Sequence, residues 1–178
     1  MAAAEDKADK IDRANEVTTS EQVAVHPVTA ADAALGRVAA RLSTLYFLRF
    51  AKMIADQAGG DLIEALVMHA IMAGNIGYLD QDPANAGKFS ALDDVPPDAM
   101  RRPISVLAVA GSVGIPYETV RRHVNRLVKA GRCERVKGGV VVRSARMREP
   151  GKDADILYNM ANLRRLYRSL IRAGVNFD

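Results

Sequence analysis

The side chains with the most distinctive chemistry lie between residues 117 and 130. Arg121 and Arg122 carry planar guanidinium groups, and Asn125 carries an amide one helical turn further along. In an α-helix these three side chains would share one side. A guanidinium can pair through two hydrogen bonds with guanine in the major groove of DNA, and an asparagine amide can pair in the same way with adenine. The pattern is therefore typical of base recognition.

Other polar and cationic side chains surround this group and could meet the phosphates of a duplex. The further candidate contacts are Tyr117, Glu118, Thr119, Arg126 and Lys129 in the same segment, Arg135, Lys137 and Arg143 after it, and Arg101, Arg102 and Ser105 before it. We expect Arg121, Arg122 and Asn125 to read bases, and Arg135 and Lys137 to hold the backbone.

Charge is divided unevenly along the chain. Residues 1–100 hold 8 Lys and Arg against 15 Asp and Glu, a net charge of −7, whereas residues 101–178 hold 17 against 6, a net charge of +11. Such segregation indicates a basic surface for a polyanion beside an acidic remainder with another role. A chance imbalance on a solvated surface would give the same totals, so the motif carries the argument.

Catalytic, metal and cofactor chemistry finds little support in the sequence. Cys133 is the one cysteine, and His26, His69 and His123 lack the spacing of metal ligands. A glycine-rich phosphate loop, a nucleophile elbow and a metal-binding histidine pair are all missing from the sequence. We therefore expect no enzyme activity, no metal and no cofactor. We read His69 as a core residue.

The sequence also favours a location in the reducing cytoplasm. A single thiol excludes a disulfide within the chain, and the charged N-terminal residues do not resemble a signal peptide. The most apolar stretch, 63–76, is interrupted by polar residues, so we expect no membrane span.

Four segments follow from periodicity and turn residues. Residues 1–28 are predicted to be a disordered tail, and Thr29 is predicted to cap a helix within 29–60 that runs to about Gln57. The DNA-binding unit is assigned to 61–148. Within it, Asp61 would cap a buried helix at 62–77, and 78–102 would be a long linker. A last helix, about 153–173, belongs to 149–178.

The segment 103–143 predicts two short helices joined by a tight turn, followed by a hairpin. Ser105 would cap a helix from Val106 to about Ser112, with Leu107 and Ala110 pointing to one side, and Gly114 would supply the positive φ of the turn. The second helix would run from Tyr117 to Ala130, with Val120, Val124, Leu127 and Val128 as its inward stripe. Strands at 133–137 and 140–143 would flank a turn at Gly138-Gly139.

These residues resemble the winged helix-turn-helix domain of bacterial regulators of the GntR-like and MarR-like groups. The matching residues are Val109-Ala110-Gly-Ser-Val113-Gly114-Ile115-Pro116, Thr119-Val120, and Leu127 to Gly131. Pro116 departs from the pattern, since a Ser or Thr usually caps the second helix there. The resemblance implies a mainly α fold with a β-hairpin wing, in which the second helix enters the major groove and the wing touches the backbone.

The expected function is that of a transcription regulator that binds double-stranded DNA. The apolar stripes of the helices at 30–57, 62–77 and 153–173 predict a homodimer, and helices 30–77 could instead enclose a pocket for a small-molecule effector. Two other functions stay open. One is a scaffold protein that uses the winged helix to bind protein. The other is a replication or partition initiator that binds DNA without regulating transcription.

Overall fold

The structure, a computed structural model, describes residues 30–81, 85 and 87–175. The predicted tail at 1–28 and the Thr29 cap lie outside these residues. The described chain is mainly helical and has one two-stranded antiparallel hairpin, which confirms the predicted class at that level. The elements are α2 (Ala30–Gln57), α3 (Leu62–Ile76), α4 (Tyr78–Gln81), η1 (Asp98–Met100), α5 (Val106–Val113), α6 (Tyr117–Lys129), β1 (Glu134–Val136), β2 (Gly139–Val141), α7 (Ser144–Met147) and α8 (Lys152–Arg172).

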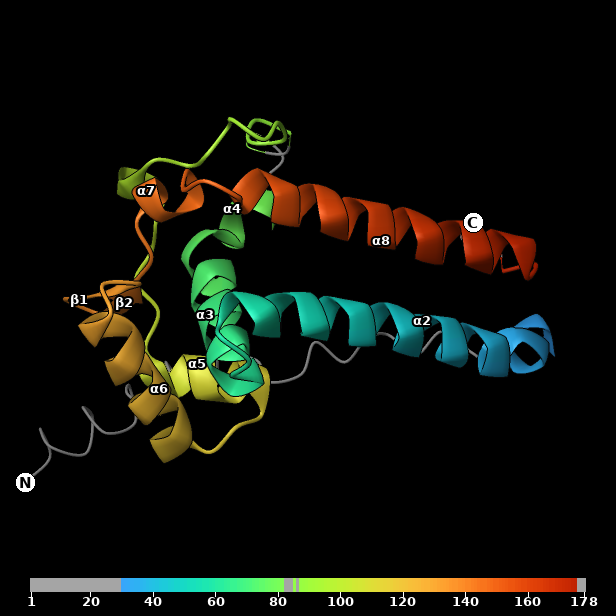
Figure 1. Ribbon diagram of the computed structural model, residues 1–178, viewed down its shortest axis with the longest axis horizontal. Helices are drawn as coiled ribbons and strands as arrows, with labels where there is room; N and C mark the ends of the chain where they lie inside the picture. The colour runs from blue at the N-terminus through green and yellow to red at the C-terminus, as the bar shows by residue number, and fades with distance from the viewer. Residues whose placement is uncertain (1–29, 82–84, 86, 176–178) are drawn as a thin grey trace, which may run out of the picture.

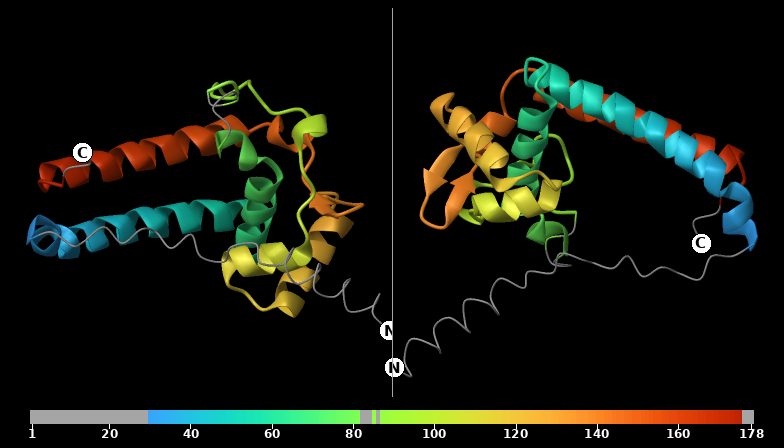
Figure 2. Two further views of the ribbon diagram at one scale, coloured as in Figure 1. Left: turned by 180° about the vertical axis from the view of Figure 1, so that it is seen from behind. Right: turned by 90° about the horizontal axis from the view of Figure 1, so that it is seen from below.

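The two long helices, α2 and α8, lie side by side and antiparallel, and they project together from one side of a compact head (Figures 1 and 2). Polar contacts connect them in the half of each helix that is nearer the head. The Tyr46 hydroxyl donates to Asn159 Oδ1 over 3.3 Å, the Asn162 amide donates to the Tyr46 carbonyl over 3.3 Å, and Lys152 Nζ donates to Gln57 Oε1 over 3.3 Å. The first and last helices of the described chain are thus partners, although more than 90 residues separate them.

The head is built from α3, α5, α6 and the hairpin (Figure 1). Its core contains side chains that are fully buried, from α3 (Val67, Ile71), α5 (Val109), α6 (Val120, Val124, Leu127) and the hairpin (Val140, Val142). Leu107 and Ala110 were predicted to point to one side of α5, but only Ala110 is buried. Leu107 is 58% exposed, and Val109 is fully buried in the core. Helix α3 is also less enclosed than its composition suggested, since Leu62 and Ile63 at its start are exposed.

Local capping explains where the head helices begin and end. Asp61 accepts a hydrogen bond from the Glu64 amide and Ser105 accepts one from the Ala108 amide, so both predicted N-caps are present. The turn between α5 and α6 depends on Gly114, whose φ of 65° lies in the left-handed region that a glycine adopts without strain. Pro116 precedes α6 and makes no side-chain cap.

The hairpin differs from its predicted register by one position. Val136 pairs with Gly139, so the turn is Lys137-Gly138 and Gly139 belongs to β2. On its other side β2 meets Ile104, because Val140 and Ile104 exchange backbone hydrogen bonds of 2.9 and 3.1 Å. Gly139 permits this approach, since a Cβ there would lie 2.1 Å from the Ile104 carbonyl oxygen. The segment before α5 is therefore fastened to the hairpin.

The predicted linker at 78–102 is partly structured. It holds α4 and η1, and the Tyr78 hydroxyl donates to the Met100 carbonyl over 2.7 Å, which joins the two ends of the segment. Among the described helices, none is both long enough and apolar enough to cross a membrane.

Candidate nucleic-acid interface

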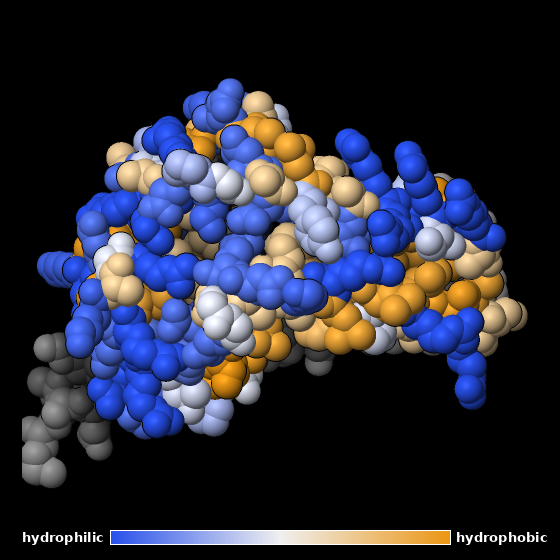
Figure 3. All heavy atoms as spheres, viewed as in Figure 1, coloured by the Kyte–Doolittle hydropathy of each residue, from blue (hydrophilic) through white to orange (hydrophobic). Residues whose placement is uncertain are grey.

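Helix α6 has two faces of opposite character. Val120, Val124 and Leu127 point inward and are fully buried, as the sequence predicted. The opposite face is exposed and polar, and Figure 3 shows hydrophilic side chains covering this end of the molecule. A helix that is anchored along one side presents the other in a fixed orientation, which a site for a rigid partner requires.

The first turn of the exposed face carries Tyr117, which is 44% exposed, and Glu118. Arg121 pairs with Glu118, with 2.9 Å between Nη2 and Oε2, and this guanidinium lowers the pKa of the Glu118 carboxyl. Arg122 is exposed, and its Nε donates to the Glu118 carbonyl over 3.3 Å. Thr119 is half-buried and its amide donates to the Pro116 carbonyl, so it serves the start of the helix.

The middle of the exposed face is connected to the hairpin. Arg135 Nη2 donates to Asn125 Oδ1 over 2.6 Å, so the two predicted contact residues from separate elements meet. Lys129 and Lys137 are exposed, and neither forms a salt bridge with any of the described residues. Arg143 reaches across the hairpin to Glu134, with 2.7 Å between Nε and Oε2. The Arg135–Asn125 bond therefore joins the hairpin to the outer face of the helix.

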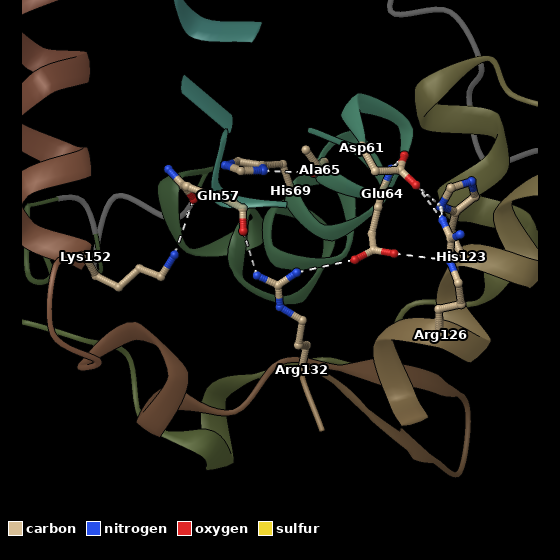
Figure 4. Close-up of polar contacts among 9 residues, drawn as sticks. All are labelled: Gln57, Asp61, Glu64, Ala65, His69, His123, Arg126, Arg132 and Lys152. Carbon is tan, nitrogen blue, oxygen red and sulfur yellow. Dashed lines mark hydrogen bonds and ion pairs between the residues drawn. The ribbon is translucent and has the colours of Figure 1, made fainter. Parts of the chain in front are cut away.

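Arg126 lies at the edge of this surface and belongs to an ion-pair network with α3 (Figure 4). Its Nη2 lies 2.6 Å from Asp61 Oδ2 and its Nε lies 3.2 Å from Glu64 Oε2. The same guanidinium donates to His123 Nδ1. We therefore read Arg126 as part of the contact between α6 and α3.

The same network brings together three groups that could ligate a metal ion. Oxygens of Asp61 and Glu64 and a ring nitrogen of His123 all lie within 4.8 Å of one another. The spacing of the histidines gave no signal for this, because the cluster is assembled from α3 and α6. Since the Arg126 guanidinium bonds to all three residues, we interpret the cluster as an ion-pair network.

Three predicted contacts before α5 have structural roles. Arg101 is buried, only 6% exposed, and its guanidinium donates to the carbonyls of Val142 and Pro96 over 3.1 and 3.2 Å. A buried guanidinium cannot contact DNA, so Arg101 does not belong to the candidate interface. The Arg102 guanidinium stacks 3.5 Å above the Tyr78 ring, and the Ser105 hydroxyl is engaged as the cap of α5.

Two residues that hold the head together were not singled out from the sequence. Asn75 is fully buried, and its side chain bonds to the Arg102 and Val140 carbonyls and to the Val142 amide, which fixes α3 to the hairpin. Arg132 connects Glu64 to the carbonyl of Gln57 at the end of α2. A polar residue within an apolar run, as Asn75 is in 63–76, was the available clue to the first.

Comparison of the chain with models of known protein families, with curated proteins and with solved structures finds no match. The likeness to winged helix-turn-helix regulators thus depends on the motif residues and on the geometry described above.

Proposed function

We propose that this protein is a winged helix-turn-helix protein that binds double-stranded DNA and regulates transcription. In this proposal α6 enters the major groove and the hairpin, as the wing, lies along the adjacent backbone. The observation that carries the proposal is the asymmetry of α6. Its inner face is fully buried, whereas Arg122, Asn125 and Lys129 stand on an exposed outer face.

The hairpin supports the same proposal. Its turn residue, Lys137, is exposed at the tip, and Arg135 is bonded to Asn125 of α6. A wing placed beside the recognition helix in this way can hold phosphates while the helix reads bases. The shift of the turn to Lys137-Gly138 strengthens the argument, because it brings a cation to the most projecting position of the hairpin.

The competing scaffold function would use the same face to bind protein. The centre of a protein interface is usually depleted in charged residues. The outer face of α6 instead carries Arg121, Arg122 and Lys129, which favours a polyanion. The exposed apolar surface of the described chain lies mainly on α2 and α8, where it supports a homodimer.

Binding to duplex DNA at graded salt concentrations tests the proposal. If a dimer neutralises about 6–10 phosphates, affinity should fall roughly 10³- to 10⁵-fold between 50 and 200 mM salt. Selection from a random duplex pool should then enrich one site, and that site becomes the probe for all later variants. Absence of binding at low salt, or tight binding that salt does not change, would contradict the proposal.

Genomic occupancy separates regulation from the replication or partition alternative. Binding near many promoters is expected of a transcription regulator, whereas occupancy confined to one replication origin or one partition locus would favour an initiator. Both outcomes are consistent with the same DNA-binding surface, and they differ only in the process that DNA binding serves.

A further inference from the structure

The antiparallel pair of α2 and α8, which we call the arm, is strongly cationic in its outer part. Residues 33–51 and 156–175 contain no Asp or Glu, but they contain seven arginines: Arg37, Arg41, Arg49, Arg164, Arg165, Arg168 and Arg172. Six of the seven are exposed, and none of the seven forms a salt bridge with any described residue. A surface with charges of one sign and no counter-charges attracts a polyanion.

Four of these arginines form a ridge along α8. Arg164, Arg168 and Arg172 follow one another at intervals of four residues, so each lies about 6 Å further along the helix than the one before. Arg165 stands beside them. These four side chains, which we call the arginine ridge, line a shallow hollow together with Ala161 and Ser169. Figure 3 shows hydrophilic side chains that project from the α8 edge of the arm.

The composition of the arginine ridge favours a chain of phosphates over a lipid bilayer. All four cations are guanidinium groups, which can bond a phosphate through two parallel hydrogen bonds. Ala161 and Ser169 are small, so phosphates can approach the helix closely between the arginines. A helix that lies in a membrane surface instead buries large apolar side chains in the lipid. On this part of α8 such side chains line a separate hollow, which shares only Arg164 with the ridge.

The arginine ridge and the outer face of α6 lie on different sides of the head. The arm extends away from α6 and the hairpin in each view of the molecule (Figures 1 and 2). Helix α8 begins at Lys152, and Arg168 lies about 24 Å further along its axis. A duplex that lies along the outer face of α6 is therefore separated from the ridge by the head.

We propose that the arginine ridge binds the phosphate backbone of a second duplex, so that the protein holds two segments of DNA together. Contacts to phosphates carry no sequence information, so the second segment can have any sequence. A protein of this kind cross-links or folds the DNA on which α6 is bound. The cross-linking rests on the proposed function of α6, whereas phosphate binding by the ridge does not.

The first measurement isolates the ridge from α6. Arg122→Glu together with Lys129→Glu should disable α6 and leave weak binding to a duplex of any sequence at about 50 mM salt. The ridge variant combines Arg164→Gln, Arg168→Gln and Arg172→Gln. Its three changes, added to the two in α6, should weaken the remaining binding roughly tenfold or more and lower the salt slope by about 2–3, because each phosphate contact contributes about 0.9.

The second measurement detects cross-linking. A duplex that carries the site selected from the random pool is fixed to beads, and a labelled duplex of unrelated sequence is offered in solution. We expect the wild type to capture the labelled duplex. The ridge variant should lose most of this capture while its affinity for the fixed site stays unchanged.

A matched variant controls for the loss of charge. Lys52→Gln, Lys88→Gln and Arg148→Gln remove the same three charges from exposed positions outside α6, the hairpin and the ridge, so this variant should capture the labelled duplex as the wild type does. Light scattering on both triple variants should give the wild-type mass, because none of the substituted side chains is apolar. A lost capture is then not due to a changed assembly.

Three results would overturn the proposal. Unchanged residual binding in the combined variant would remove the ridge as a phosphate site. Equal capture by the ridge variant and the wild type would assign cross-linking to the two α6 helices of a dimer. Vesicles of phosphatidylcholine and phosphatidylserine probe the other polyanionic partner, and we expect no binding to them. Vesicle binding that the ridge variant loses, with duplex binding intact, would assign the ridge to a membrane.

The proposed function of α6 fails by different signs. One is that the selection enriches no site, and the other is that Arg122→Glu with Lys129→Glu leaves duplex binding unchanged. In either case the comparison of duplex binding with and without the three ridge substitutions still decides whether the ridge binds phosphates.

Discussion

Arg135 of the hairpin and Asn125 of α6 are joined by a hydrogen bond of 2.6 Å between Nη2 and Oδ1. The bond orients the Asn125 amide and holds the hairpin against the outer face of the helix. An amide whose oxygen is already engaged can still donate from its nitrogen. The pair therefore presents the amide nitrogen, with its two N–H groups, and several guanidinium donors to a partner as a unit.

The first prediction concerns the division of roles between helix and hairpin. Arg122→Ala should cost about 1–3 kcal/mol of DNA-binding free energy on the selected site and blur its preference at one base pair. Lys137→Ala should weaken binding to all sequences about equally and reduce the salt slope by about one. Binding isotherms on the selected site and on single-base variants measure both effects. A change of sequence preference in Lys137→Ala, with none in Arg122→Ala, would contradict this assignment.

The second prediction is that Asn75→Ala strongly destabilises the fold. The Asn75 side chain satisfies two carbonyls and one amide in the core, and removing it leaves those groups without partners. We expect a loss of roughly 3 kcal/mol in the free energy of unfolding, at the upper end of what one buried polar network costs. Urea denaturation measures the loss. Ser112→Ala, at an exposed position on α5, is the control and should change stability little.

The helices of the head were predictable because the residues that begin and end them are recognisable in the local sequence. Asp61 and Ser105 are capping residues directly before apolar runs, and Gly114 is a residue that tolerates the left-handed turn. Buried Arg101 and exposed Leu107 were not predictable, because their environments depend on how distant segments meet. Arg101 is enclosed by the carbonyls of Pro96 and Val142, and only the second of these lies far away along the chain.

The candidate surface was predictable to the same extent. Periodicity alone separates the two faces of α6, so Arg122 and Asn125 could be assigned to the outer one. The partners of Arg126 could not be inferred, since Asp61 and Glu64 precede it by more than 60 residues. Which cations are engaged in ion pairs is a tertiary property, and no spacing rule encodes it.

The third prediction concerns acid stability. The Ser144 amide donates to Asp98 over 2.6 Å and lowers the pKa of its carboxyl, and the Glu64 amide has the same effect on the pKa of Asp61. A depressed carboxyl pKa contributes stability above the unfolded value of about 3.9, and that stability is lost as the pH falls through the folded value. Denaturation at pH 7 to 3 should show declining stability below about pH 4.

Asp98→Asn is the informative variant for this prediction. It should keep an acceptor for the Ser144 amide while removing the titrating charge, so the decline below about pH 4 should become shallower. Asp93→Asn, at an exposed position in the same segment, is the control and should leave the profile unchanged. An identical acid profile in wild type and Asp98→Asn would show that this carboxylate does not contribute.

The fourth prediction is that Cys133 is chemically inert in the native protein. The side chain is 3% exposed, and burial raises the pKa of the thiol to about 11. The thiolate, which is the reactive form, is then roughly one part in ten thousand at neutral pH. Dithionitrobenzoate should therefore react only slowly before denaturation and rapidly in guanidinium chloride. Rapid reaction of the native thiol would contradict the prediction and point to an accessible sulfur.

The fifth prediction is that the protein is a homodimer joined through α2 and α8. Ten of the large apolar side chains that are exposed in the described chain lie on these helices: Leu45, Phe47, Leu48, Ile156, Leu157, Tyr158, Met160, Leu163, Tyr167 and Ile171. Figure 3 shows much of this apolar surface on the end of the molecule that projects from the head. With about half of each side chain exposed, they offer on the order of 1,000 Å², comparable to the about 800 Å² that each partner buries in a standard interface.

A second copy of the chain is the partner that fits this surface, because two antiparallel pairs can pack as a four-helix arrangement around a two-fold axis. Light scattering at tens of micromolar should give twice the chain mass. Leu157→Glu should shift the mass toward the monomer, whereas Leu107→Glu, on α5 of the head, should not, although both residues are more than half exposed. A recognition helix reads only a few base pairs, so the monomeric variant should also lose most of its affinity for a two-fold symmetric site. A monomer mass for the wild type, with and without DNA, would reject the dimer and leave these faces to another partner.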